Sequence, residues 1–124
     1  MKRSETIYAD YLSLIDQHLD EVIGGKTDRM FELRDIAGEM CIHPTHLSNV
    51  IRELTGHHPC YFYEHKILER AKILLSDPSR SIADVAFQLT YDNSNFTKWF
   101  KKYNGSTPKA FRMQVFQNTE TVTI

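Results

Sequence analysis

An internal repeat constrains the fold of this chain more than any other feature of its sequence. With a shift of 49 positions, which brings Glu32 onto Ser81, ELRDIAGEMCIHPTHLSNVIRELTGHHPCYF aligns without a gap with SIADVAFQLTYDNSNFTKWFKKYNGSTPKAF. The identical pairs are Asp35/Asp84, Ala37/Ala86, Gly56/Gly105, Pro59/Pro108 and Phe62/Phe111. Apolar positions also match in kind. The repeat predicts two copies of one structural unit.

Each copy has the pattern of a short helix, a turn of three or four residues and a second helix. Ala37 and Ala86 stand early in the first helix of each copy. Two helices that cross closely need a small residue there, because a bulky one would force them apart. A generic helical hairpin would explain one copy, but two copies at this spacing favour tandem helix-turn-helix units.

The rest of the chain also has helical spacing, so we predict one all-α domain, 1–124, with about seven helices. Its parts are an N-terminal helix in 1–26, a first helix-turn-helix in 30–60, a linker helix in 61–77, and a second helix-turn-helix with a final helix in 80–117. Ser81 and Asp84 have the spacing of a capping box, and Asp92 or Asn93 can cap the next helix. Thr107-Pro108 can open the last one.

Composition excludes several classes of protein. No apolar run approaches the ~20 residues of a membrane span, and no signal peptide opens the chain, so we expect a cytoplasmic protein that does not bind membranes. The net charge is only −1, but its distribution is uneven. The segment 93–119 contains five basic residues and no acidic one. This end of the chain would attract a polyanion, although charge alone fits a solvated charged face equally well.

The second helix of a helix-turn-helix lies in the major groove, where its outward residues meet base edges. In the second copy we expect Phe96, Trp99, Phe100 and Tyr103 to face inward, which leaves Asn93, Ser94, Asn95, Lys98, Lys101 and Lys102 for DNA. In the first copy Leu47, Val50, Ile51 and Leu54 face inward, which leaves Thr45, His46, Ser48, Asn49 and Arg52. Asparagine can bond adenine twice, and lysine can reach guanine or phosphate.

The linker helix is long enough to separate two recognition helices. Its apolar pattern runs from Tyr61 to Leu75, or roughly 22 Å at 1.5 Å per residue. A spacer of that order could place the helices about one DNA turn apart. We therefore expect one chain to read two half-sites as a monomer.

The second copy resembles the C-terminal signature of the AraC/XylS family of bacterial transcription regulators. The matching residues are Ile82, Ala86, Phe96, Phe100, Lys101, Gly105, Pro108, Phe111 and Arg112. The first copy and ERAKILL resemble the family's other half and its linker helix. Thr90-Tyr91 stands where the family usually has Gly-Phe, and Cys41 replaces a glycine in the first turn. Both turns must therefore form without their glycine.

The resemblance implies a function as well as a fold. Family members usually carry a separate sensing domain, and this chain is similar instead to the short stand-alone regulators. The resemblance favours an activator over a repressor. The expected partner is double-stranded promoter DNA, and RNA polymerase is a candidate second partner. A DNA-binding fragment of a longer, ligand-responsive regulator is the competing interpretation, against which Met1 favours a complete chain.

Other classes of function fit the sequence less well. Cys41, His43 and His46 form one cluster of potential zinc ligands, and His57, His58 and Cys60 form another, but intervening helix separates them by roughly 15 Å or more. We expect no metal and no cofactor. No phosphate-binding loop or catalytic constellation is recognisable, so we expect no enzyme. A protein-interaction module on a helix-turn-helix scaffold is the remaining alternative.

Overall fold

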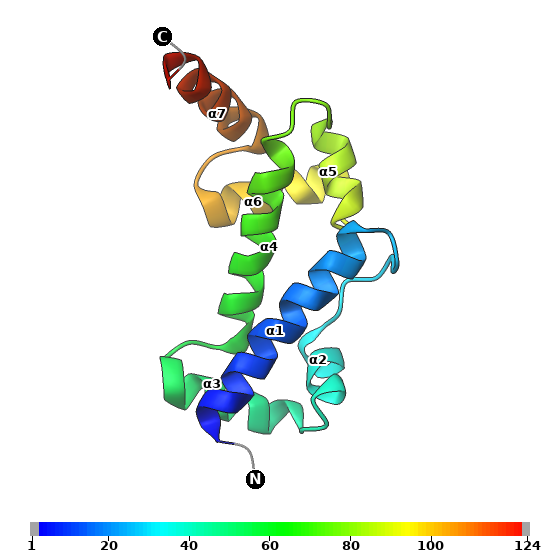
Figure 1. The fold of residues 1–124 in the computed structure, drawn as a ribbon, viewed down its shortest axis with the longest axis vertical. Helices are drawn as coiled ribbons and strands as arrows, with labels where there is room; N and C mark the ends of the chain where they lie inside the picture. The colour runs from blue at the N-terminus through cyan, green and yellow to red at the C-terminus, as the bar shows by residue number, and fades with distance from the viewer. Residues whose placement is uncertain (1–2, 123–124) are drawn as a thin grey trace. The chain divides into compact units, whose positions relative to one another are not determined.

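The computed structural model describes residues 3–122, and side chains as far as Gln117. This range consists of seven α-helices without a strand (Figure 1), which confirms the all-α prediction. The helices are α1 (Ser4–Ile23), α2 (Leu33–Glu39), α3 (Pro44–Thr55), α4 (Pro59–Leu75), α5 (Ile82–Gln88), α6 (Asn93–Asn104) and α7 (Pro108–Val122). None of the helices in this range is long and apolar enough to cross a membrane.

The chain divides into two compact units within α4. The first unit is Met1–Ile67 and contains α1, α2, α3 and the beginning of α4. The second unit is Leu68–Ile124 and contains the end of α4 with α5, α6 and α7. Each unit holds one copy of the sequence repeat.

Residues that favour helix ends set most of the helix boundaries. The Ser81 Oγ accepts a hydrogen bond from the Asp84 amide at 3.0 Å, and the Asp84 carboxylate accepts one from the Ser81 amide at 3.2 Å, so the predicted capping box is present. The Thr107 Oγ1 accepts from the Ala110 amide at the start of α7. Gly56 and Gly105 follow α3 and α6 with φ of 80° and 87°, a left-handed conformation that glycine adopts without strain.

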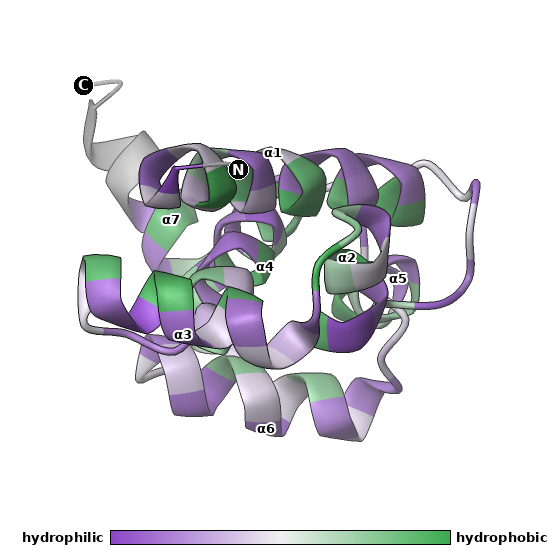
Figure 2. Ribbon diagram, turned by 90° about the horizontal axis from the view of Figure 1, so that it is seen from below, coloured by the Kyte–Doolittle hydropathy of each residue, from purple (hydrophilic) through white to green (hydrophobic). Residues whose placement is uncertain are grey.

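The core of the first unit is built on α1, which packs mainly against α3. Green and purple segments alternate along α1 in Figure 2, as expected for an amphipathic helix. Its buried residues include Ile7, Tyr11, Ile15 and Leu19. Tyr8 and Leu12, which have helical spacing to Ile15, are only half-buried.

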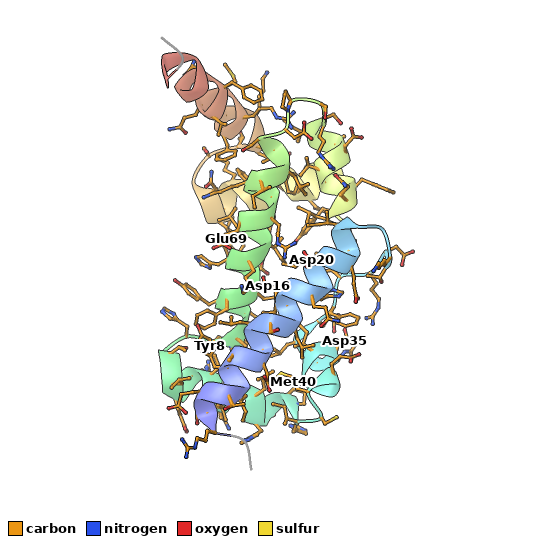
Figure 3. The ribbon with its side chains drawn as sticks, in the orientation of Figure 1. Tyr8, Asp16, Asp20, Asp35, Met40 and Glu69 are labelled. Atoms are coloured by element: carbon orange, nitrogen blue, oxygen red, sulfur yellow. The ribbon has the colours of Figure 1, made fainter. Side chains whose placement is uncertain are left out.

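Two polar contacts of long sequence separation connect α1 to the first half of α4. The Tyr11 hydroxyl donates a hydrogen bond to the Pro59 carbonyl oxygen at 2.8 Å. Burial is the main reason that the pKa of Tyr11 lies above its usual value, so the hydroxyl remains a donor. The Lys66 ammonium lies 3.0 Å from the carboxylate of Asp16, which is labelled in Figure 3. A buried, satisfied hydroxyl explains why α1 tolerates tyrosine in its core.

In the second unit, Arg112 connects α7 to the end of α4. Its Nε donates a hydrogen bond to the Leu75 carbonyl oxygen at 2.9 Å. That oxygen belongs to the last turn of α4, where carbonyl groups have no partner within the helix and a positive charge is favourable. The neighbouring Phe111 ring packs edge-on against Phe100. Phe111 and Arg112, two of the residues that carry the AraC/XylS resemblance, therefore stabilise the second unit from within.

The turn of each helix-turn-helix contains a residue with a left-handed backbone. Cys41 has φ of 60° and Thr90 has φ of 68°. The sequence comparison predicted turns without their glycine, and the structure shows that these two residues adopt the glycine conformation. A β-branched residue such as Thr90 is strained there, because its side chain collides with the backbone.

We expect Thr90→Gly to stabilise the protein by about 1 kcal/mol, since relief of the strain outweighs the extra flexibility of glycine in the unfolded chain. Thr97 lies inside α6 with ordinary helical geometry, and Thr97→Gly should destabilise by about 1 kcal/mol. Urea unfolding of both variants tests the assignment. A loss of stability in Thr90→Gly would show that the turn is not strained.

His18 is a buried polar residue of the first unit. Its Nε2 accepts a hydrogen bond from the Phe31 amide at 2.8 Å, and its ring stacks on that of Phe31 with a centroid distance of 4.0 Å. The Nδ1 atom has no hydrogen-bond partner among the described residues. Burial lowers the pKa of His18, and nearby Glu21, Arg29 and Asp35 make smaller contributions of both signs. The neutral imidazole thus holds the segment that leads from α1 to α2.

A lowered pKa in the folded state makes stability depend on pH. The unfolded chain binds a proton at His18 more readily than the folded chain does. The stability that neutral His18 contributes is therefore fully present above about pH 6.5 and is lost as the pH falls. We expect His18→Gln to be less stable than the parent at pH 7 and to lose less stability between about pH 7 and pH 5. Chemical unfolding at several pH values measures this difference. Parallel pH profiles would contradict the role of His18.

Candidate nucleic-acid interface

The structural boundaries repeat with the same shift as the sequence. The α2 and α5 helices each have 7 residues, and α3 and α6 each have 12. The first and last residues of α5 and α6 follow those of α2 and α3 by 49 positions, and Pro108 of α7 follows Pro59 of α4 by the same distance. The chain therefore contains two copies of one helix-turn-helix unit.

The two recognition helices, α3 and α6, bury equivalent side chains. Leu47 and Ile51 of α3 are fully buried, as are Phe96 and Phe100 of α6. The next pair, Val50 and Trp99, is half-buried in both helices. The last pair, Leu54 and Tyr103, is 39% and 38% exposed. The predicted inward facing is therefore right at the first and third of the four positions, and it overestimates burial at the second and fourth.

The position of Trp99 and Tyr103 on α6 explains why they are more exposed than predicted. Trp99 lies at the edge of the apolar face of α6, and Tyr103 lies in its last turn. Trp99 packs beside Tyr91, with centroids 5.4 Å apart, and beside Tyr103 at 5.6 Å. The half-buried aromatic rings thus extend the core along the flank of the helix.

The predicted DNA-contacting residues lie on the surface of each unit. In the first unit Thr45, His46, Asn49 and Arg52 are exposed on α3, and Ser48 is half-buried. In the second unit Asn93, Ser94, Asn95, Lys98, Lys101 and Lys102 are all exposed on α6. Each set occupies a single helix. The two sets belong to separate units.

Different residues cap the two recognition helices. Asp92 precedes α6, as predicted, and its Oδ1 accepts a hydrogen bond from the Asn95 amide at 2.8 Å. His43 precedes α3, and its Nδ1 accepts from the Thr45 amide at 3.1 Å. Sequence reasoning missed His43 as a cap. Its place directly before Pro44 was the available signal, because proline is common at the first position of a helix.

Charge distinguishes the two recognition helices. Between Asn93 and Asn104, α6 has three lysines and no acidic residue. By contrast, α3 has Arg52 next to Glu53. The more basic surface is therefore on α6.

The part of the chain that the structure describes contains no group of three or more histidine, cysteine, aspartate or glutamate side chains that could hold a metal ion.

The fold and this surface define a helix-turn-helix protein, and comparison with known proteins specifies the family. A family model described as "Helix-turn-helix domain" matches residues 36–114. The chain belongs to this family, and within it to the AraC/XylS type of DNA-binding domain found in transcription regulators.

Individual relatives agree with the assignment. The arabinose operon regulatory protein of Escherichia coli is 31% identical over 86 residues, which are 68% of this chain and 30% of that protein. The chain thus spans about a third of this relative. Among solved structures, an AraC-type regulator from Chromobacterium violaceum has a TM-score of 0.74 at 20% identity, covering 90% of this chain and 94% of that one. The DNA-binding domain of AdpA, solved in complex with a target DNA, has a TM-score of 0.61 at 22% identity, covering 78% and 91%.

The different burial of neighbouring aromatic residues on α6 predicts different costs of truncation. Phe100→Ala removes a fully buried ring and should destabilise by about 3–5 kcal/mol. Trp99→Ala removes a half-buried ring, and we expect about half that loss. Denaturant unfolding of the two variants provides the comparison. A Trp99→Ala variant less stable than Phe100→Ala would refute the facing of α6 described here.

Proposed function

We propose that this protein is a sequence-specific regulator of transcription that uses α3 and α6 to bind double-stranded DNA in successive major grooves. The proposed contact residues are Thr45, His46, Ser48, Asn49 and Arg52 in the first unit and Asn93, Ser94, Asn95, Lys98, Lys101 and Lys102 in the second. We further propose that it binds as a monomer and activates transcription through contact with RNA polymerase.

The surface of α6 is the observation that carries this proposal. Phe96 and Phe100 are fully buried, so the facing of the helix is fixed. Three asparagine or serine side chains and three lysines are exposed on the same helix, which has no carboxylate between residues 93 and 104. Amide side chains can read base edges, and lysines neutralise phosphates. A helix with both groups has the chemistry of a DNA reader.

The duplication supports the use of two grooves. Each unit carries its own recognition helix of 12 residues behind its own short helix, and α4 is part of both units. A chain with two such helices can read two half-sites of the DNA without a second chain. A footprint confined to a single major groove would refute this part of the proposal.

A protein-interaction module is the second candidate function. Phe87 on α5 is 82% exposed, and Ile73 on α4 is 68% exposed. The outward face of α3 is also less basic than that of α6. Apolar side chains that are exposed together in one patch mark an interface, whereas single ones occur on most protein surfaces. This function predicts binding that depends little on salt.

A DNA-binding part of a longer, ligand-responsive regulator is a variant of the first proposal. The arabinose operon regulatory protein is about three times as long as the stretch that matches this chain. In that variant the DNA contacts are the same, and a sensing domain would govern them.

The salt dependence of DNA binding tests the proposal. We expect the affinity for duplex DNA to fall steeply with salt, with a slope of about −0.9 per phosphate contact in a double logarithmic plot. Lys101→Ala and Lys102→Ala should each make the slope shallower by about 0.9 if each lysine binds one phosphate. Fluorescence anisotropy with labelled duplexes measures these slopes.

Lys26→Ala is the matched control, because Lys26 is exposed but follows α1 rather than lying on a recognition helix. Its slope should equal that of the parent. Equal effects of the three substitutions would mean that net charge alone drives binding and that α6 is not the DNA-binding helix.

A second experiment tests sequence specificity. Capture of genomic fragments by the parent protein should enrich one motif with two boxes.

A further inference from the structure

The carboxylate of Asp92 has a second bond besides the helix cap. While Oδ1 accepts from the Asn95 backbone amide at 2.8 Å, Oδ2 accepts from the Asn95 side-chain Nδ2 at 2.6 Å. Both residues are exposed. Each carboxylate oxygen thus holds a different part of the same asparagine. An exposed side chain held by a charge-assisted hydrogen bond loses much of its freedom to rotate.

This contact leaves one edge of the Asn95 amide available. The Nδ2 atom has two hydrogens, and Asp92 accepts one of them. The carbonyl Oδ1 and the second hydrogen remain. Adenine presents N7 as an acceptor and its N6 amino group as a donor in the major groove, which is the complementary pair. An amide that is already oriented loses less entropy when it forms both bonds.

We propose that Asp92 is a positioning residue that orients Asn95 to read the adenine of one A·T base pair. The inference rests on the proposed function of α6 as a recognition helix. It assigns base discrimination to a pair of residues, of which only Asn95 touches the base. Asp92 itself repels phosphate, so it weakens binding to all DNA alike while it sharpens the preference at one position.

The first unit shows that this arrangement is not a general result of capping. The residues 49 positions earlier are His43 and His46. His43 caps α3 through the Thr45 amide. There is no carboxylate at this position to hold a side chain in the next turn. The second bond is therefore specific to Asp92 and Asn95.

Two variants separate positioning from capping. Asp92→Ser and Asp92→Asn both keep a good cap for α6. Serine can cap the Asn95 backbone amide, but it has no second oxygen for the Asn95 side chain. Asparagine offers only one acceptor oxygen for the two bonds. Both variants should melt close to the parent. In the free protein, the side-chain amide resonances of Asn95 should shift and exchange faster with water in both variants.

The readout for DNA is the base preference of the full chain in a library of duplexes with a randomised central segment. The parent should prefer adenine at one position by about tenfold or more. Asn95→Ala should remove that preference, and Asp92→Ser and Asp92→Asn should reduce it severalfold while binding other sequences as tightly as the parent or tighter. Asp84→Asn, which alters the cap of α5, is the control and should keep the preference.

Three results would overturn the inference. Retained adenine preference in both Asp92 variants, with loss in Asn95→Ala, would leave Asp92 as a cap only. Unchanged preferences in Asn95→Ala would remove Asn95 from base reading. Loss of a cytosine preference in the Asp92 variants would show that Asp92 reads a base directly. If the parent selects no sequence although the Asn95 resonances shift as expected, the proposed function fails rather than the positioning contact.

Discussion

The burial of two apolar side chains, four positions apart on each recognition helix, is the interaction on which the remaining structure depends. Leu47 and Ile51 occupy these positions in α3, and Phe96 and Phe100 occupy them in α6. Ala37 and Ala86 are buried on the short helices that precede them. Small residues on one helix and large ones on the other allow a close crossing. This packing turns the polar side of each helix outward.

The same constraint explains how much of the fold follows from the sequence. Apolar spacing and helix-capping residues are local signals, and they predicted the helices and the capping box at Ser81. The two left-handed residues, Cys41 and Thr90, were predictable from the family resemblance. The facing of α6 followed from periodicity at Phe96 and Phe100. Periodicity could not say how far Trp99 and Tyr103 extend beyond the crossing, because that depends on the length of the partner helix.

Contacts between distant residues were beyond the reach of sequence patterns. The Tyr11 hydroxyl finds its acceptor 48 positions away, at Pro59. His18 accepts from the amide of Phe31, which belongs to a segment without regular spacing. In both cases a polar residue lies where the pattern alone would demand an aliphatic one. Such residues are tolerated because the fold supplies their partners, and a sequence does not reveal a partner that only the fold brings near.

The candidate site illustrates a further limit. Its residues were found because they are what remains when the apolar face is removed, a method that identifies exposed side chains but not their contacts. Asp92 was recognised as a cap, since its type and position fit that role. The hydrogen bond from the Asn95 side chain to Asp92 could not be predicted from the sequence, because the same two residues would occur in a helix whose asparagine points freely into solvent.

The repeat supports a role of this contact in binding. Two copies with the same helix lengths and the same buried positions differ at their caps, one by a histidine and the other by a carboxylate. The copies also differ at exposed positions further along these helices, such as Glu53 and Lys102, while both keep apolar residues at the buried positions. Packing constrains the buried positions alone, so the caps and the other exposed positions can vary with what each helix binds.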